Sequence, residues 1–299
     1  MTDQTFSDAL SRFVFEAGPV RGALVSLDRT CAEILACHPY PPALARVLSE
    51  LLAAAALLAS SLKFDGSITV QLQGDGPVRL LVVECDASLT LRATSQWREE
   101  IVDLPHDAPL AVLAGGARAR LVITLDPRNG EPLYQGIVAL EAASIAELIE
   151  HYLGTSEQIP SRLLIARDED RVRGMLLQKL PGSDDELWQR ASERARSIDR
   201  AELAAARTPA DFLTSQFPED DLRLFRSHAT RFRCSCSQER VENALRIVGR
   251  EEVEDILSEQ GAVSVTCEFC NRRYAFAPED ARGIFDAPRR DGPSSHVHH

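Results

Sequence analysis

Two short stretches near the end of the chain, Cys234-Ser235-Cys236 and Cys267-Glu268-Phe269-Cys270, decide the architecture of its last part. Each stretch holds a tight cysteine pair, and two such pairs are a typical ligand set for a tetrahedral thiolate zinc site. The cysteines could instead be small buried apolar side chains. Polar neighbours such as Ser237 and Asn271 argue against that alternative, because they are typical of turns. We therefore predict one Zn²⁺ held by Cys234, Cys236, Cys267 and Cys270.

The residues around these pairs predict a small zinc-binding domain over 231–286. Ser237 is expected to cap a helix that runs through Val248, and a second helix is expected over 251–260. Two short strands over 262–266 and 274–276 would flank the second cysteine pair. A domain this small rarely builds enough core to be stable without a staple, so we expect the metal to hold it together.

The composition restricts the possible partners. The chain has 299 residues, of which 44% are apolar and 26% charged, as expected for one large globular domain and a smaller one. The net charge of −12 disfavours nucleic acid as a partner, and acidic residues also outnumber arginines within 231–286. We see no glycine loop of the Walker type, so we expect no nucleotide use. We also expect that the protein is not an enzyme.

The sequence also predicts where the protein works. Residues 1–15 lack the pattern of a secretory signal, and the longest apolar run, 51–62, is too short to span a membrane. We therefore expect a cytoplasmic protein with no membrane partner. In that reducing compartment, cysteines are thiols or metal ligands rather than structural disulfides.

Residues 1–180 predict a large α+β domain dominated by antiparallel strands. A long, almost entirely apolar helix over about 43–62 is expected in its interior. A short helix is expected to begin after Ser144, with Glu147 at the capping-box position, and to end before Gly154. Strands, several of them joined as hairpins by turn sequences, are expected over 21–27, 67–73, 78–85, 89–94, 120–125, 133–140, 162–166 and 172–178.

Residues 181–230 have a different character and predict a helical linker. Charged residues are dense, and Leu187, Ala191 and Ile198 form only a thin apolar stripe. Such a helix is marginal by itself, because helix stability comes mostly from packing an apolar face. The segment is either an ordinary connector or a metastable element that masks an adhesive surface.

The cysteine site itself allows two functions. Structural zinc is the usual outcome for this spacing. Thiolates, however, are also the form that peroxide and disulfide exchange attack, so oxidation could be sensed as loss of structure. A disulfide within either cysteine pair would close a small strained ring and be readily reversed.

The sequence around the cysteines resembles the redox-regulated heat-shock holdases known as the 33 kDa chaperonin family. The resemblance rests on Phe232-Arg-Cys-Ser-Cys-Ser-Gln-Glu-Arg-Val241 and Cys267-Glu-Phe-Cys-Asn-Arg-Arg-Tyr274. It extends over about 5–286 through segments such as Gln71-Leu-Gln-Gly-Asp-Gly-Pro77, Ser156-Glu-Gln-Ile-Pro160 and Leu176-Leu-Gln-Lys-Leu-Pro181.

This resemblance implies a chaperone domain, a helical linker and a C-terminal zinc domain. It implies an ATP-independent holdase that is inactive when reduced and zinc-bound. Oxidation would release zinc, unfold the C-terminal domain and linker, and expose surface for unfolded client proteins, with an active homodimer. It also implies disulfides between Cys234 and Cys236 and between Cys267 and Cys270.

Two other functions remain as alternatives: a thiol-disulfide oxidoreductase using Cys267 and Cys270, and a zinc-ribbon nucleic-acid adaptor. The first needs a helix start at the cysteine pair, and the second needs positive charge. Outside the site, Cys31, Cys37 and Cys85 are expected to be structural thiols. The tail 287–299, with His296, His298 and His299, is expected to be disordered and at most a weak metal binder.

Overall fold

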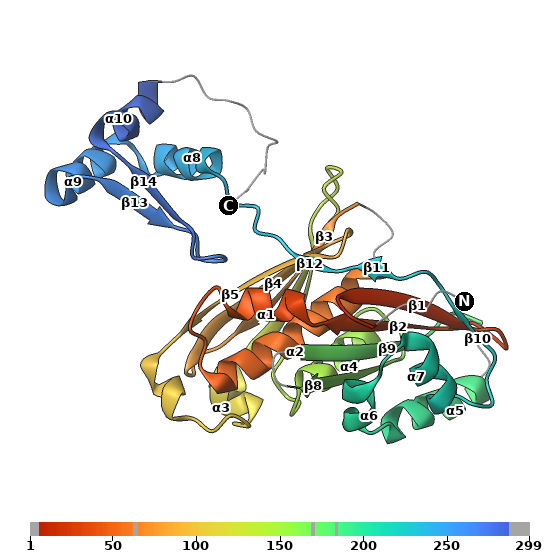
Figure 1. Cartoon of the computed structure of the whole chain (residues 1–299). Coiled ribbons are helices and arrows are strands. Elements are labelled where there is room, and N and C mark those ends of the chain that lie inside the picture. Colours follow the sequence, from red (N-terminus) through yellow and green to blue (C-terminus); the bar gives the residue numbers. More distant parts are fainter. Residues whose placement is uncertain (1–5, 62–64, 169–170, 183–184, 287–299) are drawn as a thin grey trace. The chain divides into compact units, whose positions relative to one another are not determined.

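The computed structural model describes residues 6–61, 65–168, 171–182 and 185–286 (Figure 1). It divides into two compact units, Met1–Arg233 and Cys234–His299, called here the N-terminal and the C-terminal unit. The range 181–230 falls within the N-terminal unit. The predicted disordered tail 287–299 lies outside the described residues.

The first sheet of the N-terminal unit is antiparallel and has the strand order β10-β1-β2-β9-β8, with β11 also paired to β1. Its strands are β1 (Ala9–Phe15), β2 (Val20–Leu27), β8 (Ser161–Asp168), β9 (Arg171–Lys179), β10 (Leu222–Leu224) and β11 (His228–Ala229). The sequence analysis missed β1, although its residues alternate partly between buried and more exposed positions. The short strands β10 and β11 were also missed, because they have only three and two residues and pair with β1, which is far away in the sequence.

The second sheet contains the predicted antiparallel meander. Its order is β12-β5-β4-β3-β6-β7, and only the edge strand β12 runs parallel to its neighbour. The strands are β3 (Ser67–Gln73), β4 (Val78–Asp86), β5 (Thr90–Trp97), β6 (Arg120–Asp126), β7 (Tyr134–Ala139) and β12 (Arg231–Phe232). The predicted mixed α+β class, with a sheet-rich first part, is confirmed.

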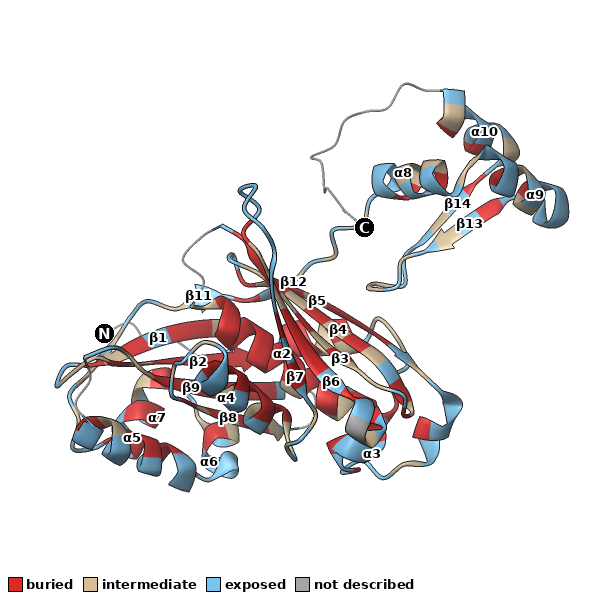
Figure 2. Cartoon of the chain, turned by 180° about the vertical axis from the view of Figure 1, so that it is seen from behind, coloured by how far each residue is buried: buried red, intermediate tan, exposed pale blue. Residues whose placement is uncertain are grey.

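The helix α2 (Pro42–Ala59) forms the centre of the N-terminal unit. It contacts strands of both sheets, and nearly all of its residues are buried, as predicted (Figure 2). Among the described residues it is the one helix long and apolar enough to cross a membrane, but most of it lies inside the protein. It is therefore a core helix. It ends at Ala59, earlier than predicted.

Shorter helices complete the periphery of this unit. In α4 (Ile145–Thr155) the Ser144 hydroxyl accepts a hydrogen bond from the Glu147 amide at 3.2 Å, as the capping-box pattern predicts. The helix does not end before Gly154 as predicted, but one residue after it. The remaining short helices are α1 (Arg29–Leu35), α3 (Leu110–Ala114) and the 3₁₀ turns η1 (Glu99–Asp103) and η2 (Gly116–Arg118).

Three helices of the linker range lie along the first sheet: α5 (Asp185–Ser197), α6 (Arg200–Ala205) and α7 (Pro209–Gln216). Their apolar side chains and those of the sheet form one cluster, separate from the main core around α2. The linker side contributes Leu187, Ala191, Ala195, Ile198, Leu203, Phe212, Leu213 and Phe217. The remaining members are Phe6, Phe13, Phe15, Val20, Leu24, Ala166, Met175 and Leu177, most of them on the sheet. The linker helices thus cover an apolar sheet face.

The C-terminal unit contains α8 (Gln238–Val248), α9 (Arg250–Gln260), the hairpin β13 (Val263–Thr266) and β14 (Arg273–Phe276), and α10 (Pro278–Asp286). The two predicted helices and both strands are present. The sequence analysis did not predict α10. The described core of this unit consists of eight buried apolar residues: Val241, Leu245, Val253, Leu257, Val263, Phe276, Ala281 and Ile284.

Replacement of Gly76 by alanine is expected to destabilise the N-terminal unit by about 1–3 kcal/mol. A Cβ atom there would lie 2.4 Å from the Gly115 nitrogen and 2.6 Å from the Leu113 carbonyl oxygen, and backbone cannot yield as a flexible side chain does. Gly154→Ala is the matched control, because a Cβ there meets no atom within 4 Å. It should be neutral or stabilising by up to about 1 kcal/mol. Urea unfolding of both variants measures the difference, and equal stabilities would contradict the expectation.

Candidate metal centre

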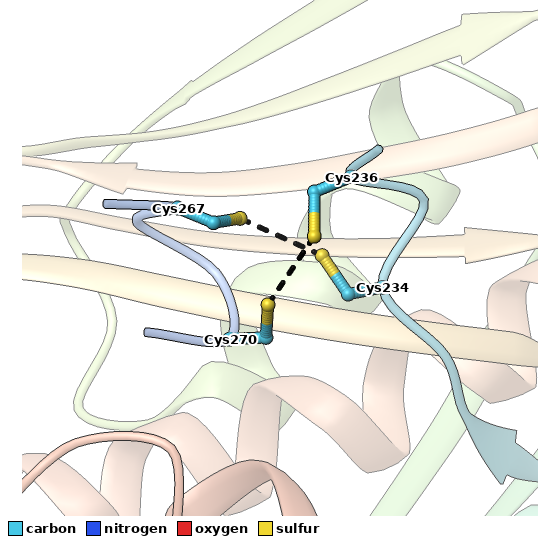
Figure 3. A group of neighbouring side chains, drawn as sticks. All are labelled: Cys234, Cys236, Cys267 and Cys270. Atoms are coloured by element: carbon cyan, nitrogen blue, oxygen red, sulfur yellow. Dashed lines mark hydrogen bonds between the residues drawn. The ribbon is translucent and has the colours of Figure 1, made fainter. Parts of the chain in front are cut away.

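Four cysteine side chains meet at one end of the C-terminal unit (Figure 3). Cys234 and Cys236 lie in the segment that leads into α8, whose first turn is capped by the Ser237 hydroxyl. Cys267 and Cys270 lie in the turn between β13 and β14. The predicted set is therefore brought together from two separate parts of the unit.

Backbone hydrogen bonds shape the turn that carries the second pair. The Cys267 amide donates to the Arg272 carbonyl, and the Asn271 amide donates to the Cys267 carbonyl, both at 2.9 Å. Asn271 adopts a positive φ of 57°, a conformation that asparagine tolerates better than most residues. The hairpin register of Thr266 opposite Arg273 closes the turn. Both thiols are thus held on a rigid support.

The distances between the sulfur atoms fit a tetrahedral metal ion. Cys234 Sγ lies 3.6 Å from Cys267 Sγ, and Cys236 Sγ lies 3.4 Å from Cys270 Sγ. All four sulfurs lie within 4.8 Å of one another. Zn–S bonds of about 2.3 Å place tetrahedral sulfurs about 3.8 Å apart. The four-thiol chemistry and this spacing are therefore compatible with zinc.

The thiols differ in their electrostatic environment. Burial raises the pKa of Cys236, but hydrogen bonds from the Tyr274 hydroxyl and the neighbouring thiols outweigh it and lower the pKa to about 7. Burial raises the pKa of Cys234 and of Cys270. A thiol that ionises near neutral pH is a ready first ligand for a cation.

Tyr274 contacts the cysteine cluster, a contact that the sequence analysis did not predict. Its hydroxyl donates a hydrogen bond to Cys236 Sγ at 3.2 Å. The same bond raises the pKa of Tyr274 to about 12, since the neutral phenol is the donor. The Arg272 guanidinium lies 5.6 Å from the centre of the tyrosine ring and packs on it. The position of Tyr274 on β14, four residues after Cys270, is the only sequence signal for this role.

The other cysteines lie away from this centre. Cys31 and Cys85 are buried in the N-terminal unit and Cys37 is half-buried there. Cys31 donates to the Ser49 hydroxyl at 3.4 Å, and burial raises the pKa of the Cys85 thiol. These environments are those of structural thiols. The tail residues His296, His298 and His299 lie outside the described residues.

The structure weakens the interpretation of Cys267 and Cys270 as a catalytic dithiol. A thioredoxin-like pair needs a helix N-terminus to lower the pKa of the attacking thiol. Here the pair lies in a turn between the two strands β13 and β14.

Comparison with known proteins agrees with this architecture. The family model described as "Hsp33 protein" matches residues 8–277. The 33 kDa chaperonin of Chromobacterium violaceum is 42% identical over 282 residues, covering 93% of this chain and 94% of the relative. The 33 kDa chaperonin of Shewanella loihica is 40% identical over 287 residues, covering 95% and 98%. A crystal structure of the 33 kDa chaperonin from Thermotoga maritima has the same fold, with a TM-score of 0.82 at 24% identity, and covers 93% of this chain and 98% of that one.

Metal removal is expected to unfold the C-terminal unit and leave the N-terminal unit folded. Structural zinc in small domains contributes about 10–16 kcal/mol of apparent binding free energy, more than a small core supplies. Reduced protein should contain one zinc per chain by atomic absorption, and Cys270→Ser should lose it. Limited proteolysis should then cut within 238–286. Cys37→Ser is the matched control and should retain zinc; zinc content unchanged in Cys270→Ser would contradict the site.

Tyr274→Phe is expected to weaken zinc binding about tenfold while the fold is retained. The variant removes only the hydroxyl that donates to Cys236 Sγ, so the sulfur loses a bond that stabilises its thiolate form. Competition with a chromogenic chelator measures the affinity. Tyr134→Phe, which alters an exposed tyrosine of β7, should bind zinc as the parent does. Equal affinities for all three proteins would remove the role of Tyr274.

Proposed function

Because this chain belongs to the Hsp33 family, we propose that it is an ATP-independent chaperone that holds unfolding proteins during oxidative stress. In the proposed resting state it is reduced, zinc-bound and inactive. Oxidation of Cys234, Cys236, Cys267 and Cys270 activates it. The observation that carries the proposal is the four-thiol cluster within a unit whose described core has eight buried apolar residues.

The proposed sensor depends on the small size of the apolar core in the C-terminal unit, because the metal must then supply most of the stability. Two of the exposed large apolar side chains of the protein, Ile247 and Val248, lie at the end of α8 rather than in this core. Zinc supplies a charge that four thiolates can surround, and thereby links the segment before α8 to the β13–β14 turn. Without that link the unit has too small a core to remain folded.

The proposed oxidation joins Cys234 to Cys236 and Cys267 to Cys270. Each disulfide forms in two steps: one hydrogen peroxide oxidises a thiol to a sulfenic acid and is itself reduced to one water, and the neighbouring thiol then attacks the sulfenic sulfur and displaces a second water. The oxidised cysteines no longer offer thiolate ligands. In the folded unit the closest sulfur contacts run between the pairs, from Cys234 to Cys267 and from Cys236 to Cys270. Bonding within the pairs therefore fits a unit that is losing its structure, when only chain neighbours remain close.

The proposed output is exposure of the sheet face beneath the linker. The side chains under α5, α6 and α7 include Phe13, Phe15 and Met175, all fully or almost fully buried by the linker and its surroundings. Continuity of the chain supplies the coupling, because Cys234 follows β12 almost directly. An apolar face of this kind binds the exposed apolar segments of unfolding proteins. We propose it as the client-binding surface.

The helix α5 is suited to release. Among its buried residues Leu187 is the one large apolar side chain, and the others are Ala191, Ser192 and Ala195. Burial of an alanine contributes much less than burial of a leucine, so the helix is held weakly. This favours the metastable interpretation of the range 181–230 over an ordinary connector.

The remaining parts of the proposal follow the family. We propose a cytoplasmic protein that becomes a homodimer when active and has neither nucleic acid nor membrane among its partners. The net charge of −12 supports the exclusion of nucleic acid, and the burial of α2 supports the exclusion of a membrane span. No enzymatic activity is part of the proposal.

The decisive experiment follows aggregation of a heat-denatured client by light scattering. Reduced, zinc-loaded protein should not suppress aggregation, and peroxide-treated protein should. Zinc release and loss of four thiols should accompany activation, and peptide mapping should find both disulfides within the pairs. Equal suppression in both redox states would remove the switch. Suppression in neither state would remove the chaperone, and turnover in an insulin-reduction assay would favour the oxidoreductase instead.

Arg173→Met is expected to release the linker without an oxidant. Arg173 is almost fully buried on β9, and its guanidinium donates to the carbonyls of Leu203, Ala204 and Ala206 at the end of α6. A cation at a helix C-terminus satisfies carbonyls that have no partner within the helix. Its loss should destabilise linker packing by about 2–4 kcal/mol.

The measurement is proteolysis within 185–217, together with basal holdase activity of the reduced protein. Arg171→Met is the matched control on the same strand, because Arg171 is exposed and its ion pair with Asp168 is long, at 4.0 Å. It should change stability by less than about 0.5 kcal/mol. Equal proteolysis of the two variants would show that Arg173 does not hold the linker.

A further inference from the structure

The N-terminal unit contains a cavity of about 540 Å³ that the proposed chaperone function does not use. Its walls are formed by β1, β2 and β9, by the residues that follow α2, and by 225–228, the segment that leads from β10 into β11. Cavities of about 300–1,000 Å³ are typical of small-molecule sites. The cavity is separate from the four-cysteine centre, which lies in the other unit.

Positive charge is concentrated in this cavity although the chain as a whole is acidic. Arg12, Arg21, Arg226 and His228 line it, and no aspartate or glutamate is among its described lining residues. No carboxylate in the described part of the chain forms an ion pair with any of these arginines. By contrast, the nearby Arg223 is paired with Glu16 at 2.6 Å. Within the described residues, the positive charge of the cavity is therefore not paired with a carboxylate.

The contacts of these arginines orient them without neutralising them. Arg21 Nε donates to Gln178 Oε1 at 3.1 Å, and Gln178 is itself buried. Arg12 Nη2 lies 3.5 Å from His228 Nε2, which accepts when the imidazole is neutral. Burial, and then the charge of Arg12, lower the pKa of Arg21. An anion placed between the two guanidinium groups would relieve both effects.

The rest of the lining is apolar. Val14, Ala23 and Leu176 provide apolar surface from the three strands, and the exposed Phe225 forms part of the wall from the linker side. The hydroxyls of Ser60 and Ser61 already donate to carbonyls of α2. A ligand that fits must therefore place a negatively charged end against the arginines and an apolar body against the strands.

We propose that this cavity binds a small organic anion with an apolar body, of the class of medium-chain carboxylates. The planar guanidinium groups of Arg12 and Arg21 bind the carboxylate, because their donors match its two oxygens. The apolar chain lies against Val14, Leu176 and Phe225.

Binding also favours one arrangement of the linker. Residues 225–228 supply part of the wall, so the ligand binds only while they lie against β1. A ligand that binds one state stabilises it by mass action. Hydrogen exchange of the amides of β10 and β11 should therefore slow when the site is filled. This effect does not require the proposed chaperone activity.

Calorimetric titration of the reduced, zinc-loaded full chain with decanoate, below its micelle concentration, tests the site. One decanoate should bind per chain. Each methylene removed from the ligand should weaken binding roughly fourfold. Decanol, which lacks the charge, and inorganic phosphate, which lacks the apolar body, should each bind at least about tenfold more weakly. Equal binding of decanol would overturn the proposal, and so would equal binding of phosphate.

Arg12→Gln and Arg21→Gln should each weaken decanoate about tenfold. Arg29→Gln is the matched control, since it removes the same charge from an exposed arginine outside the cavity. If Arg21→Gln lowers the unfolding temperature of the free protein, Arg12→Gln and Phe225→Ala test the site instead. Arg12 and Phe225 are exposed, so their replacement should leave the fold intact. If decanoate binds these variants as tightly as it binds the parent protein, its binding site lies elsewhere on the surface. The inference then fails.

Discussion

The C-terminal unit depends on one constraint, which is that four thiols must meet at one point. The eight buried apolar residues of its described core come from α8, α9, β13, β14 and α10, and none of them joins the segment before α8 to the β13–β14 turn. The sulfur cluster makes that connection. A fold held in this way is sensitive to any chemistry that converts thiolates into another form, which is the physical basis of the proposed sensor.

The N-terminal unit is held together by a large apolar core rather than by a cluster of thiols. Its main core surrounds α2 and needs no metal, because the helix is apolar on almost every side and contacts strands of both sheets. The linker helices are held against this stable unit by a second apolar cluster, by the Arg173 guanidinium and by short strands paired with β1. In the proposed mechanism these contacts are lost and the linker separates from the sheet while the main core, which forms a separate cluster, stays intact.

The same arrangement gives the linker two faces with different chemistry. The segment 185–217 covers an apolar sheet face, whereas 225–228 borders a cavity with positive charge. Apolar surface can bind the apolar segments of unfolded chains, and arginines that pair with no carboxylate among the described residues can bind an anion. The linker range 181–230 therefore contributes to both proposed sites: its helices cover the client surface, and its last residues border the anion site.

The sequence by itself predicted which four cysteines meet, the α+β class and most elements, because cysteine spacing, strand alternation and capping residues are local signals. Ser144 with Glu147 and Ser237 predicted two helix starts that the structure contains. The tertiary structure alone revealed β10, β11 and β12, which are ordered only by their partner strands. It alone also revealed the hydrogen bond of Tyr274 to Cys236, the hydrogen bonds of Arg173 to the end of α6, and the cavity lined by Arg12 and Arg21. These features depend on residues far apart in the chain, and no local pattern records which of them will meet.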